Sequence, residues 1–182
     1  ICIWPSKLYK SEFNGSHWQV SLVNQDKNVT EQVQNISAKF VIDASGRQST
    51  FARSQGIQRL QIDKLISCWA ILPNSEELIL GTITASEQGW WYSAPLPGNK
   101  RVLAYQTDSD LLHPKDRKTI DGFIKLAKNN EAIQEILSNC PNDNITFKGT
   151  VSANSTRLKE VTGKQWAALG DAAISFDPLS SQ

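Results

Sequence analysis

A short apolar run at residues 166–169, which stops at Gly170 and Asp171, constrains the fold more than any other stretch. Such a run predicts a strand buried on both faces, as in parallel sheets. A glycine at the end of a buried strand lets a ligand approach the backbone, and an aspartate accepts hydrogen bonds from hydroxyl groups. The pair therefore predicts a ligand site, although an ordinary strand and turn explain these residues equally well when they are taken alone.

A second apolar run, at residues 39–43, ends in a similar way in Asp43-Ala-Ser-Gly46. We expect another parallel strand there, a left-handed turn at Gly46, and a short helix with Ser49 as its N-cap. This order of strand, turn and helix start directs backbone N–H groups at one point, which favours binding of an anion. The alternating pattern upstream, in residues 1–35, predicts a small antiparallel meander.

Between the two runs the pattern changes to longer strands joined by short turns, which predicts an antiparallel sheet. Alternation sends Trp90 and Tyr92 to one face of this sheet and Trp91 and Ser93 to the other. One pair is expected to pack on helices, and the other pair either joins the core or lines a cavity. The expected elements are strands at residues 60–72, 77–85, 89–97, 100–108 and 145–151, and amphipathic helices at 120–127 and 133–137.

The order of these elements predicts an α+β protein with two lobes, the first of which is discontinuous in sequence. Residues 1–58 and 164–182 are expected to form an α/β lobe that carries the meander. Residues 59–163 are expected to form a second lobe, in which two helices cover an antiparallel sheet.

Composition and charge exclude several classes of function. A net charge of +1 provides no basic surface for nucleic acid, and no apolar run approaches the roughly 18 residues that a membrane helix needs. Three widely spaced cysteines predict free thiols in a reducing compartment, and hence a cytoplasmic protein. His17 and His113 have no partners at ligand spacing, so no metal site is predicted. The chain has no methionine and begins inside a strand-like run, which indicates a piece of a longer protein.

The two turns together resemble a known family. Residues 39–49 and 170–180, about 120 residues apart, resemble the second and third flavin-site motifs of FAD-dependent oxidoreductases. The fold that this implies is that of p-hydroxybenzoate hydroxylase and glutathione reductase, with Asp43 and Gly46 near the cofactor. The resemblance covers essentially the whole chain.

The resemblance also implies roles for the second turn. Asp171 would hydrogen-bond the ribityl chain of FAD, Gly170 would allow that approach, and the segment from Ala172 to Pro178 would run beside the isoalloxazine. The glycine-rich fingerprint that holds the FAD pyrophosphate in this family is absent. The chain is therefore expected to begin after that fingerprint and, alone, to be unable to hold FAD.

Within the superfamily, Asp43-Ala-Ser-Gly46 and the later Phe-Asp-Pro-Leu-x-Ser of residues 176–181 look like motifs of flavin-dependent tryptophan-halogenase-like proteins. Those proteins receive reduced flavin from a separate reductase. The halogenase motif W-x-W-x-I-P is matched only in part, by Trp90-Trp-Tyr-Ser-Ala-Pro95. Relatives that share the Asp-Pro-Leu-Ser-Ser ending mature quinone cofactors by modifying a protein side chain.

The leading hypothesis is a FAD-dependent oxidoreductase of the monooxygenase or halogenase type. It acts on an aromatic small molecule or a protein side chain, with Trp90 and Tyr92 facing the substrate. No residue is identified as a general acid or base. A geranylgeranyl-reductase-like flavoprotein is an alternative and would need a long apolar cavity. The second alternative is a non-enzymatic binding module, in which Gly170 and Asp171 would form an ordinary turn.

Overall fold

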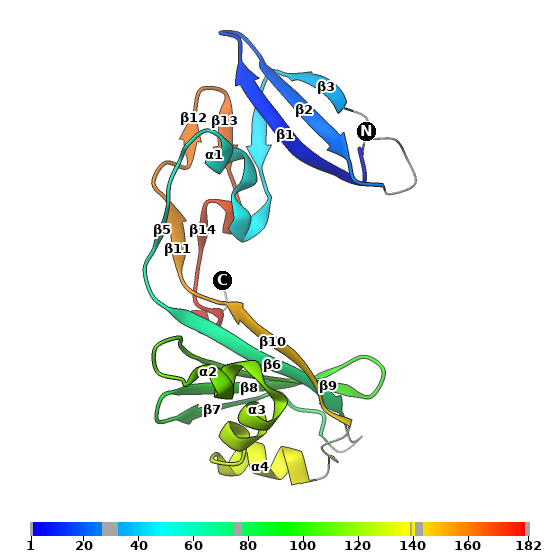
Figure 1. Ribbon diagram of the computed structural model, residues 1–182, viewed down its shortest axis with the longest axis vertical. Helices are drawn as coiled ribbons and strands as arrows, with labels where there is room; N and C mark the ends of the chain where they lie inside the picture. Colours follow the sequence, from blue (N-terminus) through cyan, green and yellow to red (C-terminus); the bar gives the residue numbers. More distant parts are fainter. Residues whose placement is uncertain (1, 27–32, 75–77, 139, 141–143, 181–182) are drawn as a thin grey trace. The chain divides into compact units, whose positions relative to one another are not determined.

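The computed structural model describes residues 2–26, 33–74, 78–138, 140 and 144–180, which fold as two compact units (Figure 1). Unit 1 comprises Ile1–Ile62 and Ser155–Phe176, and unit 2 comprises Asp63–Asn154 and Asp177–Gln182. The sequence placed the divisions after residues 58 and 163. In the structure, residues 59–62 and 155–163 belong to unit 1 instead of the sheet unit. Residues 177–180 belong to unit 2 instead of unit 1.

Unit 1 contains the expected meander and a strand in each of the two apolar runs. The order of the meander is β1-β2-β3, and both pairings are antiparallel. β4 pairs parallel with β13, with Val41 opposite Trp166, so the two apolar runs are neighbours in one sheet. A third small sheet has the order β14-β11-β5. The strands of unit 1 are β1 (Ser6–Phe13), β2 (Trp18–Asn24), β3 (Val33–Ala38), β4 (Val41–Asp43), β5 (Arg59–Gln61), β11 (Thr156–Leu158), β12 (Thr162–Gly163), β13 (Trp166–Ala168) and β14 (Ile174–Ser175).

The core of unit 1 is aromatic and joins elements from both of its segments. Phe51, in helix α1 (Thr50–Ser54), contacts Trp18 of the meander and Trp166 of β13, with ring centroids 4.9 and 5.9 Å apart. The prediction that β4 is buried on both faces is wrong for the described residues, because Ile42 is 58% exposed. β4 is also the last strand on its side of the sheet β12-β13-β4.

Unit 2 is a five-stranded antiparallel sheet of order β10-β6-β9-β8-β7. Its strands are β6 (Leu65–Pro73), β7 (Thr82–Ser86), β8 (Gly89–Leu96), β9 (Lys100–Asp108) and β10 (Thr146–Ser152). The sheet confirms the antiparallel prediction, but the first expected strand divides into β5 of unit 1 and β6 of unit 2. The expected start of the second strand, at residue 77, lies outside the described residues.

Three helices accompany this sheet: α2 (Pro114–Lys118), α3 (Ile120–Ala127) and α4 (Glu131–Ser138). α3 has the predicted bounds, and its apolar residues at i, i+3, i+4 and i+7 join the core. Its N-cap Thr119 accepts a hydrogen bond from the N–H of Gly122 at 3.1 Å. A Cβ at Gly122 would lie 2.5 Å from the Cα of Asp116, so only glycine allows α2 and α3 to pack this closely.

The two faces of the sheet in unit 2 differ as alternation predicts. Trp91 is 1% exposed and contacts Tyr105 and, on helix α3, Phe123, with ring centroids 4.6 and 5.4 Å apart. Burying an aromatic side chain such as Phe123 contributes about 1.5–3 kcal/mol, so this face carries much of the stability of unit 2. Trp90 and Tyr92 lie on the other face, which the helices do not cover.

Cys2 is exposed, while Cys68 and Cys140 are buried in unit 2, and none of the three forms a disulfide. Burial raises the pKa of both the Cys68 and the Cys140 thiols. Within the described parts of the chain, no three metal-ligand side chains gather together. Among the same residues, no helix has both the length and the apolar character needed to cross a membrane.

Candidate functional site

The first predicted turn is organised by the carboxylate of Asp43, which is 3% exposed at the end of β4. Its Oδ1 accepts hydrogen bonds from the N–H and hydroxyl of Ser45, at 3.1 and 2.6 Å. Its Oδ2 accepts one from the N–H of Ala52 at 2.9 Å. The carboxylate therefore ties the end of β4 to the start of α1. With three protein donors on it, Asp43 shapes the turn near the expected cofactor, and a direct contact with the cofactor stays a prediction.

The helix start after this turn differs from the prediction. Ser49 is the residue before α1, but it has a left-handed backbone (φ +45°) and makes no capping bond. Its buried hydroxyl instead donates to the carbonyl oxygen of Ala172 at 2.8 Å. The N–H groups of Thr50 and Ala52 donate to the Ser45 hydroxyl and to Asp43. Since these donors are already used, the expectation of an anion at this helix start has no support in the structure.

The second predicted turn lies beside the first. The N–H of Leu169 donates to the carbonyl oxygen of Asp43 at 2.9 Å, so the ends of β13 and β4 are held together. Gly170 has φ +55° and begins a short 3-10 turn, η3 (Gly170–Ala172). Asp171 in this turn is exposed and Ala172 is fully buried. The structure thus brings together five of the six residues predicted to contact the cofactor, and it leaves one carboxylate, that of Asp171, facing outward.

Both glycines have open space where a side chain would lie. A Cβ at Gly46 or at Gly170 would meet no atom within 4 Å among the described residues. Each glycine also has a positive φ, +64° and +55°, which other residues rarely adopt. These positions therefore fit close approach of a cofactor to the backbone, as expected for FAD.

Arg59 of β5 joins the two turns, and sequence reasoning did not identify it. Its guanidinium donates to the carbonyl oxygens of Asp171 and Ala172 at 2.8 and 3.1 Å. It also donates to the hydroxyl of Ser49 in the first turn. Two further bonds reach the hydroxyls of Thr156 and Ser175, at 2.6 and 3.0 Å. One side chain thus holds both turns and two neighbouring strands in a single arrangement.

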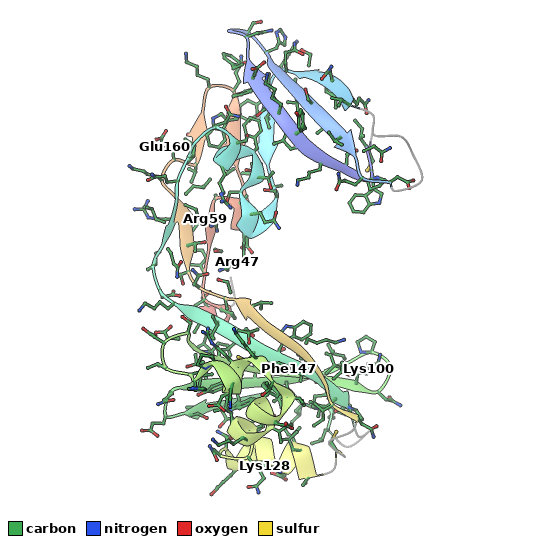
Figure 2. The ribbon with its side chains drawn as sticks, in the orientation of Figure 1. Arg47, Arg59, Lys100, Lys128, Phe147 and Glu160 are labelled. Atoms are coloured by element: carbon green, nitrogen blue, oxygen red, sulfur yellow. The ribbon has the colours of Figure 1, made fainter. Side chains whose placement is uncertain are left out.

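Two arginines and two aspartates act on the charge of Arg59, namely Arg47, Arg53, Asp43 and Asp171. Burial lowers the pKa of the Arg59 guanidinium, the nearby charge of Arg47 lowers it further, and Asp171 opposes this. Figure 2 labels Arg47 and Arg59 in this part of unit 1. Nothing in the local pattern of residues 58–61 indicated this role, because the partners of Arg59 lie as far away in sequence as Ser175.

Unit 2 brings Trp90, Tyr92 and Pro178 together around one cavity. Its volume is about 260 Å³, and its walls are formed by Ile83, Trp90, Tyr92, Gln106, Pro178 and Leu179. The structure therefore places Pro178, expected beside the flavin, against the two candidates for substrate contact. Sequence reasoning missed the other three members of this wall, Ile83, Gln106 and Leu179. A larger cavity of about 590 Å³, at the turn around Gly98, contains none of the expected residues.

Comparison with known proteins places these features in context. No family model matches the chain. The chain is 28% identical, over 179 residues, to LodB of Marinomonas mediterranea, a protein provisionally named as a FAD-dependent oxidoreductase. The match covers 96% of this chain and 47% of LodB, so the chain spans about half the length of this curated relative.

Two solved structures show the same fold. The flavin-dependent halogenase CmlS matches with a TM-score of 0.78 and 15% identity, over 97% of this chain and 32% of CmlS. The halogenase PltM, in complex with phloroglucinol and FAD, matches with a TM-score of 0.72 and 18% identity, over 97% of this chain and 38% of PltM. These matches confirm the α+β fold and the resemblance to the FAD-dependent oxidoreductase superfamily.

Proposed function

We propose that this chain is part of a longer FAD-dependent oxidoreductase of the monooxygenase or halogenase type. The observation that carries the proposal is the pair of turns after β4 and β13. Leu169 bonds one to the other, Arg59 bonds to both, and both open onto free space at a glycine. LodB, CmlS and PltM, which the chain resembles over nearly all of its length, are named as flavin enzymes or oxidoreductases.

FAD, when bound, supplies the oxidation and reduction chemistry. Gly46 and Gly170 leave room for it against the backbone, and the exposed carboxylate of Asp171 accepts hydrogen bonds from the hydroxyls of its ribityl chain. Arg59 fixes the carbonyl groups of Asp171 and Ala172 and so holds the turn in one conformation. The protein's contribution is thus to position the cofactor and the substrate.

The cavity in unit 2 is the proposed place of the substrate, an aromatic small molecule or an aromatic protein side chain. Trp90 and Tyr92 offer aromatic surface to it. The aromatic walls and small volume favour a ring over a long prenyl chain, which argues against the reductase alternative. Resemblance to flavoproteins argues against a simple binding module. A separate flavin reductase as partner and a cytoplasmic location belong to the same proposal.

Two features support a longer protein. The chain matches about half of LodB. In addition, Phe40 and Ile42 beside and in the edge strand β4 are 54% and 58% exposed, and no strand among the described residues pairs with that edge. Apolar side chains at an open sheet edge are usually covered in a complete protein. The fragment alone is therefore proposed to be inactive.

The test is to purify the complete protein that contains this chain and to measure bound flavin by its visible absorbance. We expect FAD to bind, and Asp171→Ala to weaken its binding about tenfold, because one or two hydrogen bonds are lost. Asp110→Ala, which removes an exposed carboxylate in unit 2, is the matched control and should leave FAD affinity unchanged. A protein that stays colourless with added FAD would overturn the proposal.

A further inference from the structure

The uncovered face of the sheet in unit 2 carries a polar group next to its aromatic residues. Gln106 of β9 lies directly opposite Trp90 of β8 in the antiparallel register. Residues two apart on a strand share a face, so Tyr92 lies on the same side as Trp90 and Gln106. All three line the cavity of about 260 Å³. Gln106 therefore belongs to the wall of the proposed substrate site.

The side chain of Gln106 is buried but incompletely satisfied. It is 5% exposed, and no hydrogen-bond donor among the described residues reaches its Oε1. Other buried polar side chains nearby do have partners; the hydroxyl of Thr107, for example, donates to the carbonyl oxygen of Gln88. Buried polar atoms in folded proteins are nearly always paired, so an unpaired acceptor on a cavity wall indicates a donor that enters from the cavity.

The backbone holds Gln106 in a fixed place. Its neighbours on β8 and β6 are Trp90 and Ser67, so it lies in the middle of a paired strand. A Cβ at Gly89 would lie 2.1 Å from the carbonyl oxygen of Gln106, which means that only glycine permits this close pairing of β8 with β9. An acceptor on such a rigid element is presented at a defined point of the cavity.

The other lining residues define what the cavity accepts. Its walls are apolar or aromatic apart from Gln106, the hydroxyl of Tyr92 and the indole N–H of Trp90. Its volume lies just below the range of about 300–1,000 Å³ that is typical for drug-sized ligands, which suits one ring or two fused rings. The chemistry of the wall therefore matches an aromatic ring with a single hydrogen-bond donor at its edge.

We propose that Gln106 is the specificity-determining residue of this cavity, and that its Oε1 accepts a hydrogen bond from an N–H or O–H on the bound ring. The inference rests on the proposed function, since it concerns the substrate of that same site. An analogue without the donor leaves Oε1 buried and unpaired, and sites of this kind reject such analogues. One hydrogen bond between neutral groups contributes about 0.5–1.5 kcal/mol, so the selection is expected to be about tenfold.

The experiment compares matched ligands on the complete protein by isothermal titration calorimetry. Indole is compared with 1-methylindole, and phenol with anisole, so that each pair differs in the donor. We expect the wild-type protein to bind the donor-bearing member about tenfold more tightly. Equal affinity within both pairs, or no binding of indole at about 1 mM, would overturn the inference.

Variants assign the selection to Gln106. Gln106→Leu should bring the ratio of affinities within each pair to about one, with 1-methylindole bound at least as well as before, because an unpaired acceptor has been replaced by apolar surface. Gln106→Met is a second variant of similar length, should the first fail to fold. Tyr92→Phe removes the phenolic hydroxyl from the same wall and leaves Gln106 in place, so the tenfold preference should persist. Loss of the preference in Tyr92→Phe, or its survival in Gln106→Leu, would contradict the assignment.

Two further measurements complete the experiment. One tests whether the ring belongs to a free molecule or to a protein side chain, and the other separates the role of Gln106 from the proposed flavin function. A short peptide with tryptophan, compared with one carrying 1-methyltryptophan, tests a protein side chain against the free ring. Both sets of titrations are run with and without added FAD, and FAD binding is recorded independently. A protein that binds FAD but does not discriminate between the paired ligands contradicts only the role of Gln106. A protein that discriminates but never binds FAD contradicts only the proposed oxidoreductase.

Discussion

Arg59 in unit 1 and Arg101 in unit 2 use the same chemistry for different purposes. Arg101 is fully buried and Arg59 is half-buried, and burial lowers the pKa of each guanidinium. Neither forms an ion pair with a carboxylate among the described residues. Each instead donates to carbonyl oxygens and to neutral side-chain oxygens. The partners of Arg101 are the side chains of Asn74 and Ser93 and the carbonyl oxygens of Leu78 and Leu80.

The difference lies in how far apart these partners are in the sequence. Every partner of Arg101 lies within 27 residues of it, so this side chain closes one local loop against the sheet. The partners of Arg59 include Asp171 and Ser175, which are 112 and 116 residues away. A local set of bonds stabilises one unit, whereas the distant set determines how two functional turns meet. We therefore expect Arg101 to matter for stability alone, and Arg59 to matter for both stability and cofactor binding.

The largest effect on stability is expected from Arg101→Leu. The substitution leaves several buried acceptors without a donor, which should cost unit 2 about 2–4 kcal/mol. Urea denaturation measures this loss. Alkylation of Cys68 localises it, because the buried thiol, whose pKa is raised by burial, reacts only when unit 2 opens. Affinity for FAD should be unchanged, and a large fall in that affinity would show that the two arginines do not differ as proposed.

A smaller loss of stability, but a change in function, is expected from Arg59→Leu. We expect a loss of about 1–3 kcal/mol, since part of the guanidinium remains accessible to water, together with FAD binding at least tenfold weaker. Arg59→Lys should restore little of either, because an ammonium group cannot reach Ser49, Asp171 and Thr156 at once. Cys68 should stay protected from alkylation in the native protein. Unaltered FAD affinity in both variants would show that Arg59 does not contribute to cofactor binding.

The smallest effect on stability is expected from replacing the two aspartates of the turns, Asp43 and Asp171, by asparagine. Asp43→Asn keeps the shape of the side chain but turns an NH2 group towards donors, which should lower stability by about 1–2 kcal/mol. Asp171→Asn should leave the urea midpoint unchanged, because the carboxylate is exposed. Equal midpoints for the two variants would show that Asp43 does not organise its turn. The comparison uses the same substitution at both sites, so differences in side-chain volume do not enter.

The parts of the fold that local pattern encodes could be predicted. The apolar spacing of residues 120–127 defined α3, and alternation placed Trp90 and Trp91 on opposite faces. Both apolar runs form strands, as expected, and Val41 in one lies opposite Trp166 in the other. Each of these conclusions needs only neighbouring residues or one strand pairing. Short elements such as α2 were missed, because one polar turn of helix carries no periodic signal.

The parts of the site that depend on distant contacts could not be predicted. Ser49 occupies the expected N-cap position, but its hydroxyl bonds to Ala172, which the local sequence does not reveal. In the sequence, Arg59 is an ordinary polar residue on a short strand. Its role is visible only in the fold, because its partners include both Ser49 and the distant Ser175. Gln106 could have been found by pairing β8 with β9 in register, since that places it opposite Trp90. Its unpaired oxygen, however, depends on the surrounding packing.

The discontinuity of unit 1 has a consequence for how the protein is made. The contacts of unit 2 lie almost entirely within Asp63–Asn154, so this unit can assemble while the rest of the chain is still being synthesised. The pairing of β4 with β13 must wait for more than a hundred further residues, and contacts of such long range form slowly. Until then the aromatic side chain of Phe51 lacks one of its partners, Trp166. On the ribosome, the turns of unit 1 that are proposed to hold the flavin are thus completed after the sheet of unit 2.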